Sequence, residues 1–521
     1  MSDIANRIGE LTPAQLAALH ARLRDRASTR PEQDAIPRLE ERSAPLSFAQ
    51  ERLWFMDRMS PGNVAYNLTE AIQLTGELDA GALEQAFAAV VESQQALRTV
   101  FREQDGRGVQ IVEPTTSWSM RFLDLADRPE SEHGEAVRSL VANEEEHPFD
   151  LEHGPLLRTL VVKLGERAHV LILTLHHIIA DGWSFGVLIE GLSTAYNGLV
   201  AGEAVPLPDP AIQYADFAAW QRDRLTGPRL DALREHWRDR LAGVPNTLEL
   251  RGARPRPARQ SFRGDHQDFV VPNEVADELR KLSRASNTTM FMTLTAVFAV
   301  LLAHHSDQRD FAIGTDIANR TRRETNGLVG LFVNQLVLRA DLSGDPSFAD
   351  VLAQVRRTTL DAFDHQDLPF QALVADLAPR RSLDRNPLFQ VLLVLQEPVL
   401  DRTRLQGIAV RPVTLAAGTR STAFDLSVHL TETRQGLEGA LRYSTDLFPE
   451  QMIRELAADF TFLLGEVALR QGATLGALSA ALHSARAARL SERTVEARAA
   501  AGRILRSVKR KAMGDSEGER S

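Results

Sequence analysis

Two adjacent histidines followed by an aspartate, a glycine and a serine form the most chemically active string in the sequence. The string is His176-His177-Ile178-Ile179-Ala180-Asp181-Gly182-Trp183-Ser184. An imidazole with an ordinary pKa near ~6.5 exchanges protons at neutral pH, and a carboxylate beside it orients donors or pairs with a cation. Burying such groups without partners is costly, so their clustering indicates either a functional site or a fully hydrogen-bonded structural cluster.

Three chemistries are compatible with this string. Two histidines and an aspartate are legitimate metal ligands, although adjacent residues on an extended strand point to opposite faces. The segment 182–186 satisfies G-x-S-x-G, and Asp425 and His429 follow Ser184 in the order of a hydrolase triad. A nucleophile elbow, however, needs its serine at the sharp turn itself, and Ser184 lies past the predicted strand end. The third chemistry is general acid–base catalysis by one histidine, without a covalent intermediate.

A buried strand and a helix must position the string. Residues 170–175 form a short, nearly continuous apolar run bounded by polar residues, which predicts a strand covered on both faces and ending at His176. Residues 185–199 predict a helix directly after it. The candidate site therefore lies where a buried strand turns into a helix.

The rest of the chain alternates helical and strand-like segments, so we expect an α/β (α+β) fold of two packed lobes with the site between them. Further predicted elements are helices at 80–96, 212–224 and 289–304, strands at 311–313, 336–338 and 391–395, and a hairpin over 427–446. The predicted domains are an N-terminal helical appendage at 1–44, a first lobe at 45–228, a second lobe at 229–481 and an Ala/Arg-rich, helical and disordered tail at 482–521.

The composition excludes several kinds of function. The 521 residues include 60 Lys and Arg, 70 Asp and Glu and no cysteine. Disulfides, thiolate metal sites and a cysteine nucleophile are therefore excluded. The net charge of -10 gives no support to nucleic-acid binding, which needs a dense basic surface. The N-terminus carries no secretion signal, and no stretch approaches the roughly 18 apolar residues of a membrane span, so we expect a cytoplasmic protein with no membrane partner.

The string at 176–184 resembles the HHxxxDG signature of the condensation domains of nonribosomal peptide synthetases, which belong to the chloramphenicol acetyltransferase-like superfamily. Further strings resemble this family's motifs and occur in the family's order. They are SFAQERLWF at 47–55, ALRT at 96–99, YADFAAWQ at 214–221, IGTDIANR at 313–320, GLFVN at 330–334, HQDLPF at 365–370 and RNPLFQ at 385–390. The resemblance covers about residues 45 to 470 and favours the acid–base chemistry over the other two.

The resemblance implies two acetyltransferase-like lobes arranged in a V, with a tunnel through the cleft. It also implies an acyltransferase that joins an acyl or peptidyl thioester, held on the phosphopantetheine arm of a carrier protein, to an amine acceptor, usually on a second carrier. A soluble amine, or an alcohol that would give an ester, is the alternative acceptor. We expect no bound cofactor and no metal. His177 matches the family's catalytic histidine, which would hold the attacking amine and receive its proton.

Supporting roles for three further residues follow by similarity. His176 is expected to be structural and turned into its own lobe. Asp181 would orient the turn and pair with Arg320. Replacing either member of that pair would strand a buried charge, so a loss of activity there would include a loss of stability.

The remaining candidate site residues are less constrained by the resemblance. Gly182 would let substrate approach the backbone, and its amide is a candidate oxyanion donor, unless the glycine serves only the turn. Trp183 and Ser184 are expected to pack against and cap the following helix. Together with Asn334 they are also candidate tunnel residues.

Departures from the family's motifs leave the subtype open. Residues 93–95 are Ser-Gln-Gln where the family often has Arg-His-Glu. Heterocyclisation domains carry aspartates in place of the two histidines, and GLFVN resembles condensation rather than epimerisation members. No adenylation or carrier segment is recognisable, so we expect a freestanding enzyme, with a domain cut from an assembly line as the alternative. Two other classes stay open: a serine acyl hydrolase using Ser184, and a catalytically silent scaffold that binds carriers.

Overall fold

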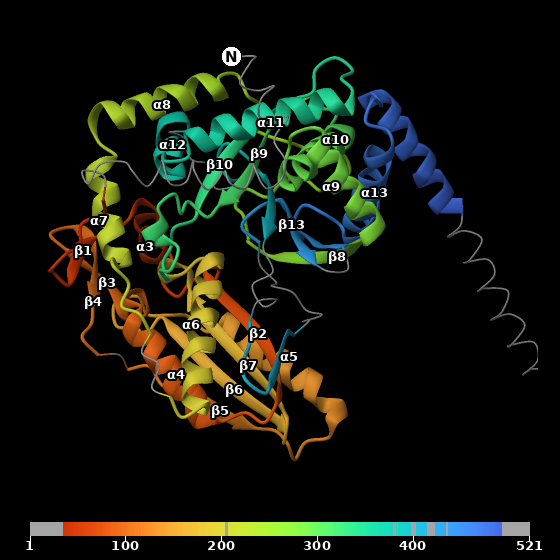
Figure 1. Ribbon diagram of the computed structural model, residues 1–521. Helices are drawn as coiled ribbons and strands as arrows, with labels where there is room; N and C mark the ends of the chain where they lie inside the picture. Colours follow the sequence, from red (N-terminus) through yellow and green to blue (C-terminus); the bar gives the residue numbers. More distant parts are fainter. Residues whose placement is uncertain are drawn as a thin grey trace, which may run out of the picture.

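The chain folds into two lobes, each built on a mixed sheet with covering helices (Figure 1). The computed structural model describes residues 35–115, 117–203, 207–378, 382, 384–396, 403–413, 422–433 and 436–491. In Figure 1 the first lobe is coloured red to yellow, apart from one blue-green strand at residues 408–412, and the second is coloured green to blue. Helices α7 (Tyr214–Arg224) and α8 (Gly227–Leu241) lead from the first lobe to the second.

A five-stranded sheet forms the first lobe, in the order β12-β2-β7-β6-β5. Its strands are β2 (Asn67–Gly76), β5 (Arg121–Asp124), β6 (Leu157–Gly165), β7 (Ala168–His176) and β12 (Ile408–Pro412). Helices α4 (Ala80–Ser93) and α6 (Gly182–Val200) pack on one face, and α5 (Glu130–Glu146) packs on the other. All residues of β7 except its first are buried, which confirms the prediction of a strand covered on both faces.

A small three-stranded sheet, in the order β1-β4-β3, completes the first lobe. It consists of β1 (Ser43–Pro45), β3 (Thr99–Gln104) and β4 (Arg107–Val112), with α3 (Phe48–Met59) following β1. Helix α4 begins after the N-cap Asp79, whose side chain accepts a hydrogen bond from the backbone of Ala82. It ends at Ser93, before the predicted end at residue 96, because Gln94 is extended and a 3-10 turn follows at Gln95–Arg98.

A six-stranded sheet forms the second lobe, in the order β10-β9-β11-β13-β14-β8. Its strands are β8 (Gly264–Pro272), β9 (Asp310–Ile317), β10 (Asn334–Asp341), β11 (Val391–Gln396), β13 (Leu426–Thr433) and β14 (Gly436–Ser444). One face packs against α9 (Asn273–Ala285), α10 (Met290–Ser306), α11 (Phe348–Asp364) and α13 (Glu450–Leu469), and the other against α8 and α12 (Phe370–Leu377). The three predicted strands and the hairpin over 427–446 are confirmed.

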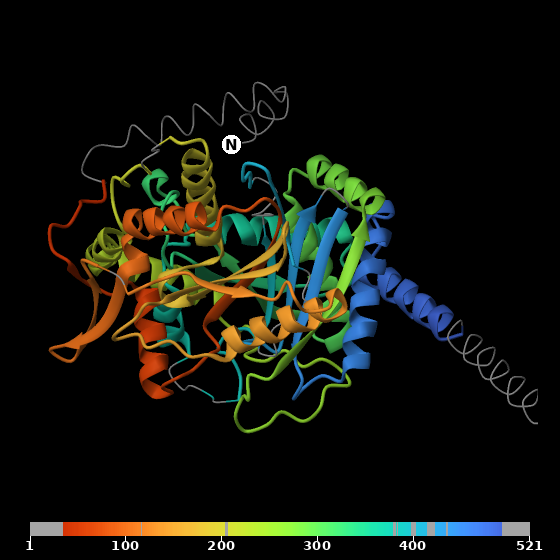
Figure 2. The same ribbon diagram turned by 90° about the horizontal axis from the view of Figure 1, so that it is seen from below.

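Three elements cross the predicted domain boundaries. β1 includes residue 44 and pairs with β4 of the first lobe. β12, from the range predicted for the second lobe, pairs with β2 in the first. Helical residues 475–491 continue past residue 481 and lie at the outer edge of the second lobe (Figure 2). The predicted appendage before residue 35 and the tail after residue 491 lie outside the described residues.

Helix α10, predicted at 289–304, is the most deeply buried helix of the second lobe's core. Its N-cap Thr289 accepts a hydrogen bond from the backbone of Met292. Within the part of the chain that the structure describes, no single helix is long and apolar enough to cross a membrane. Helices α9 and α10 meet that test only as a pair, and they are bent by 105°.

Candidate active site

The string at 176–184 lies where β7 turns into α6, and both halves of the chain contribute to it. β7 ends at His176, a 3-10 turn spans His177–Ile179, and α6 begins at Gly182. Segment 328–332, from the second half of the chain, packs its apolar side chains into the core of the first lobe. The site is therefore held by contacts that join the two halves.

His177 is oriented through its Nδ1 atom. Its backbone N–H donates to Tyr66 O at 2.8 Å, and its Nδ1 lies 2.7 Å from Ala180 O. Because a carbonyl oxygen only accepts, Nδ1 carries the proton and Nε2 of the neutral ring keeps a lone pair. The residue is half-buried. His177 is thus arranged to accept a proton at Nε2.

His176 is buried and points into the first lobe. Its Nδ1 accepts a hydrogen bond from the backbone N–H of Ile178 at 3.1 Å, and the ring meets Phe149 edge-on, with centroids 6.0 Å apart. Burial, with a smaller contribution from the neighbouring His177, lowers the pKa of His176 to about 3. At neutral pH this imidazole is uncharged and serves as a packed hydrogen-bond acceptor.

Asp181 caps α6 and also binds segment 328–332, which comes from the second half of the chain. Its Oδ1 accepts from the backbone N–H of Ser184 at 2.9 Å and from the Ser184 hydroxyl at 2.7 Å. Its Oδ2 accepts from the backbone N–H of Phe332 at 3.0 Å. The cap makes α6 begin at Gly182, earlier than the predicted residue 185.

The expected ion pair between Asp181 and Arg320 is present. Arg320 Nη2 lies 3.2 Å from Asp181 Oδ1, and the two side chains are only 2% and 3% exposed. Arg320 Nη1 also donates to the backbone oxygens of Thr325 and Leu328, and the guanidinium lies 4.0 Å above the Phe332 ring. Burial lowers the pKa of the Arg320 guanidinium, and the Asp181 carboxylate opposes that effect. The pair therefore ties the site of the first lobe to the second half of the chain.

The hydrolase triad considered for Ser184 is wrong. The Ser184 hydroxyl is buried and makes hydrogen bonds with Asp181 and with the backbone of Gly330, at 2.7 and 2.9 Å. Asp425 instead forms an ion pair with Arg256, and His429 lies 3.1 Å from Ser427 Oγ. The Ser184 hydroxyl donates in both of these contacts and also accepts from the backbone N–H of Gly330 at 3.1 Å, so it has neither the exposure nor the basic partner that a nucleophile needs.

The string does not form a metal site either. His176 Nδ1 accepts the Ile178 amide hydrogen, and both Asp181 oxygens accept donors from the protein. His177 Nδ1 is engaged with Ala180 O. These ligand atoms are directed at separate partners and do not converge on one point.

Three further candidate residues surround this core. An added Cβ at Gly182 would meet nothing within 4 Å, so packing within the protein does not require a glycine there. Trp183 donates from its indole nitrogen to Asn326 O at 2.9 Å, which links α6 to the loop just before segment 328–332. Asn334 is buried and uses its side-chain amide to hold the loop before α12, donating to Gln366 O at 3.0 Å and Leu368 O at 2.8 Å.

Asp316, on β9, is a titratable neighbour of His177 that the sequence did not single out. Gln335 Nε2 donates to Asp316 Oδ1 at 3.0 Å. Burial raises the pKa of Asp316, while the Gln335 hydrogen bond and the charges of His177 and Arg52 act to lower it. Asp316 lies in the string IGTDIANR, which the sequence did point to, but the sequence does not show that β9 packs towards β7.

The fold of two packed lobes with the histidine turn agrees with the resemblance to condensation domains, and sequence comparison gives the family. A profile described as "Condensation domain" matches residues 40–483, so the chain belongs to the condensation domain family. It is 42% identical over 443 residues to a linear gramicidin synthase of Brevibacillus parabrevis, covering 85% of this chain and 9% of that protein. It is 38% identical over 480 residues to phosphinothricin tripeptide synthetase PhsC of Streptomyces viridochromogenes, covering 92% of this chain and 44% of that protein.

Solved structures have the same fold. The X-domain from teicoplanin biosynthesis matches with a TM-score of 0.75 and 28% identity, covering 86% of this chain and 99% of that one. The SgcC5 protein from Streptomyces globisporus, in complex with (R)-(-)-1-(2-naphthyl)-1,2-ethanediol and sucrose, matches with a TM-score of 0.69 and 28% identity, covering 82% and 99%. The chain spans less than half the length of the two synthetases above, whereas it matches these solved domains almost end to end.

Proposed function

We propose that this chain joins an acyl or peptidyl thioester, presented on the phosphopantetheine arm of a carrier protein, to an amine acceptor, and that His177 is its catalytic residue. Condensation domains of nonribosomal peptide synthetases are acyltransferases that form amide bonds together with carrier proteins. The observation that carries the residue assignment is the hydrogen bond between His177 Nδ1 and Ala180 O, because it leaves the Nε2 lone pair for the acceptor amine.

The proposed step is a direct acyl transfer. The amine nitrogen attacks the thioester carbonyl carbon, and a carbon–nitrogen bond forms as the carbon–sulfur bond breaks. The amine loses a proton to His177 Nε2, and that proton then passes to the departing thiolate. No acyl-enzyme is formed, which agrees with the buried and fully engaged Ser184 hydroxyl.

The surrounding residues position this imidazole. Asp181 and Arg320 fix the turn that carries His177, and they do so from both halves of the chain. Asp316 is proposed to stabilise, when ionised, the imidazolium that forms during the step, because the charges of the two side chains interact. The open space beside Gly182 is proposed to admit the substrate, with the Gly182 amide as a donor to the oxyanion.

An alcohol acceptor, which would give an ester, is the second candidate. It is supported by the likeness to SgcC5, a structure of which contains a 1,2-ethanediol derivative. The same base would serve, because a hydroxyl also has to lose a proton as it attacks the carbonyl. The two candidates therefore differ in the acceptor and not in the role of His177.

Intact-protein mass spectrometry tests the proposal. An acyl-loaded carrier would be incubated with the protein and a panel of amine, alcohol and carrier-bound acceptors, and the ligated product would be measured. Wild type and His153→Ala, a control at an exposed histidine, are expected to form product, whereas folded His177→Ala is expected to form none. Wild-type release of free acid, lost on Ser184→Ala but not on His177→Ala, would overturn the proposal in favour of a hydrolase.

A further inference from the structure

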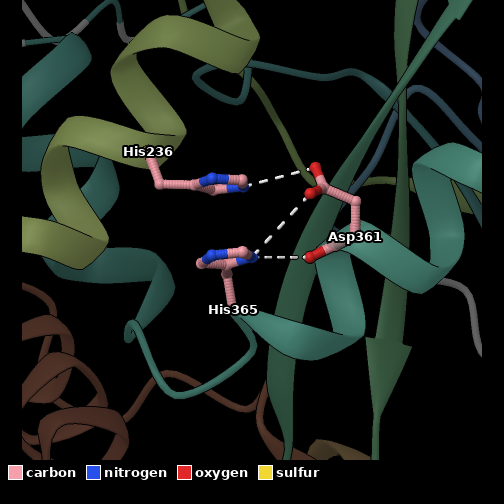
Figure 3. Close-up of side chains that lie close together, drawn as sticks. All are labelled: His236, Asp361 and His365. Atoms are coloured by element: carbon pink, nitrogen blue, oxygen red, sulfur yellow. Dashed lines mark hydrogen bonds and ion pairs between the residues drawn. The ribbon is translucent and has the colours of Figure 1, made fainter. Parts of the chain in front are cut away.

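A second group of potential ligand side chains lies in the other lobe, between α8 and α11 (Figure 3). It consists of His236 on α8, Asp361 in the last turn of α11 and His365 at the C-cap of that helix. In the part of the chain that the structure describes, these are the only three such side chains whose ligand atoms all lie within 4.8 Å of one another. The catalytic step proposed above does not use them.

The fold brings the three side chains together from two rigid helices. Asp361 and His365 are four residues apart on α11, so they share one face of the helix. α8 is fixed against them because the Trp237 indole donates to His365 O at 3.1 Å and Arg229 pairs with Asp367 at 2.6 Å. The backbone positions of the group are therefore set by contacts that do not depend on an ion.

The two imidazoles present their nitrogens to the same carboxylate. Their rings are stacked, with centroids 3.4 Å apart and planes 6° from parallel. His236 Nε2 lies 3.3 Å from Asp361 Oδ2, and His365 Nδ1 lies 4.0 Å from Asp361 Oδ1 (Figure 3). The three side chains are 21% to 31% exposed, so a small ion can reach them.

One ligand atom of the group lacks a good hydrogen-bond partner, and the group borders a cavity. His236 Nε2 is buried and makes no well-formed hydrogen bond. Asp361 also borders a cavity of ≈ 560 Å³ lined by Trp237 and Arg240, which provides an entry path to the carboxylate.

We propose that His236, Asp361 and His365 bind one divalent transition-metal ion of the class that accepts imidazole and carboxylate ligands, such as Zn²⁺ or Co²⁺. Two local contacts must give way. Arg240 Nε, which lies 2.6 Å from Asp361 Oδ2, is displaced by the ion. His365 Nδ1, which donates to Asp361 O at 2.8 Å, leaves that carbonyl and gives up its proton to water, and the ring takes up a proton at Nε2, so that Nδ1 can coordinate the ion. The rings also open from their parallel stack, so that both lone pairs point at one ion.

The bound ion would link α8 to α11. Because α8 follows α7 on the connection from the first lobe to the second, its docking fixes one end of that connection. The ion's role would therefore be to stabilise the arrangement of the lobes, and His177 would carry out the same chemistry with or without it. Binding to the folded state alone raises the melting temperature by mass action.

Titration of the tag-free, metal-stripped full chain with Co²⁺ tests the proposal, read by the visible absorption of the bound ion and by calorimetry. Wild type is expected to bind one equivalent, with nitrogen-ligand absorption and a higher melting temperature. His236→Ala and Asp361→Asn are each expected to weaken binding at least tenfold. His153→Ala is the matched control, because it removes an exposed histidine that also lies beside an aspartate, at 2.9 Å.

Two results would overturn the proposal. One is that wild type binds Co²⁺ or Zn²⁺ with no greater stoichiometry or affinity than the His236→Ala variant does. The other is binding that survives His236→Ala but is lost with His153→Ala. Circular dichroism of each variant establishes that it is folded, and X-ray absorption of the wild-type cobalt complex reports its nitrogen ligands without relying on any variant.

Discussion

Replacing Arg320 is expected to lower the free energy of unfolding, because Arg320 neutralises a buried carboxylate and takes no direct part in the acyl transfer. Arg320→Met would leave Asp181, whose side chain is 3% exposed, without its counter-ion. Removing one partner of a buried ion pair costs about 3–5 kcal/mol. Asp181 keeps the backbone donors of Ser184 and Phe332, so we expect the lower end, about 3 kcal/mol. Urea unfolding followed by circular dichroism measures the change through the shift in midpoint.

The double variant separates a stranded charge from simple loss of packing. Asp181→Asn removes the charge, so the combination with Arg320→Met is expected to be more stable than the sum of the single effects by about 1–3 kcal/mol. Arg138→Met, at an exposed pair with Glu135, is the matched control and is expected to cost less than about 1 kcal/mol. Additive single effects, or an Arg320→Met variant as stable as the control, would refute the reasoning.

Three further outcomes are expected. Acidification should destabilise the protein, because burial lowers the pKa of His176 and of His429 to about 3, whereas unfolded imidazoles titrate near 6.5. The unfolded chain then binds more protons, so the urea midpoint should fall as the pH drops from about 6.5 towards 3, and less steeply in His429→Gln; an equal slope would count against this. Asp459→Asn removes a fully buried carboxylate paired with two arginines of the helix at 475–491, whose side chains are 34% and 30% exposed. Because the arginines left behind reach solvent, the change should cost about 1.5–3 kcal/mol and speed hydrogen exchange in that helix; unaltered exchange would show that these ion pairs do not hold the helix in place. Gly182→Ala should slow turnover without lowering the melting temperature, because the added methyl meets open space; a loss of stability would show that the glycine serves the turn.

Local patterns predicted the elements that hold the site. The apolar run at 170–175 corresponds to β7, and the strings around Asp181 and Arg320 led to an ion pair between residues 139 positions apart in the sequence. The strand prediction succeeds because burial and periodicity leave a direct trace in the residue types. The resemblance supplied the pairing of the two strings, which periodicity alone does not contain.

Long-range pairings could not be predicted in this way. β12 joins the sheet of the first lobe although it follows most of the second lobe in sequence. Segment 328–332 enters the core of the first lobe, and nothing in its short apolar pattern identifies the partner. Asp316 and the group around His236 likewise depend on which elements pack side by side. Residue types indicate which side chains are buried, but they do not indicate which distant part of the chain packs against them.

The most direct test of the account is the single-turnover rate of acyl transfer from a loaded carrier to an accepted amine, compared between wild type and His177→Ala. Loss of general-base catalysis is expected to slow the step by about 10²–10⁴-fold, with the melting temperature unchanged because the His177 side chain is only half-buried. A folded His177→Ala variant that transfers the acyl group at the wild-type rate would contradict the account.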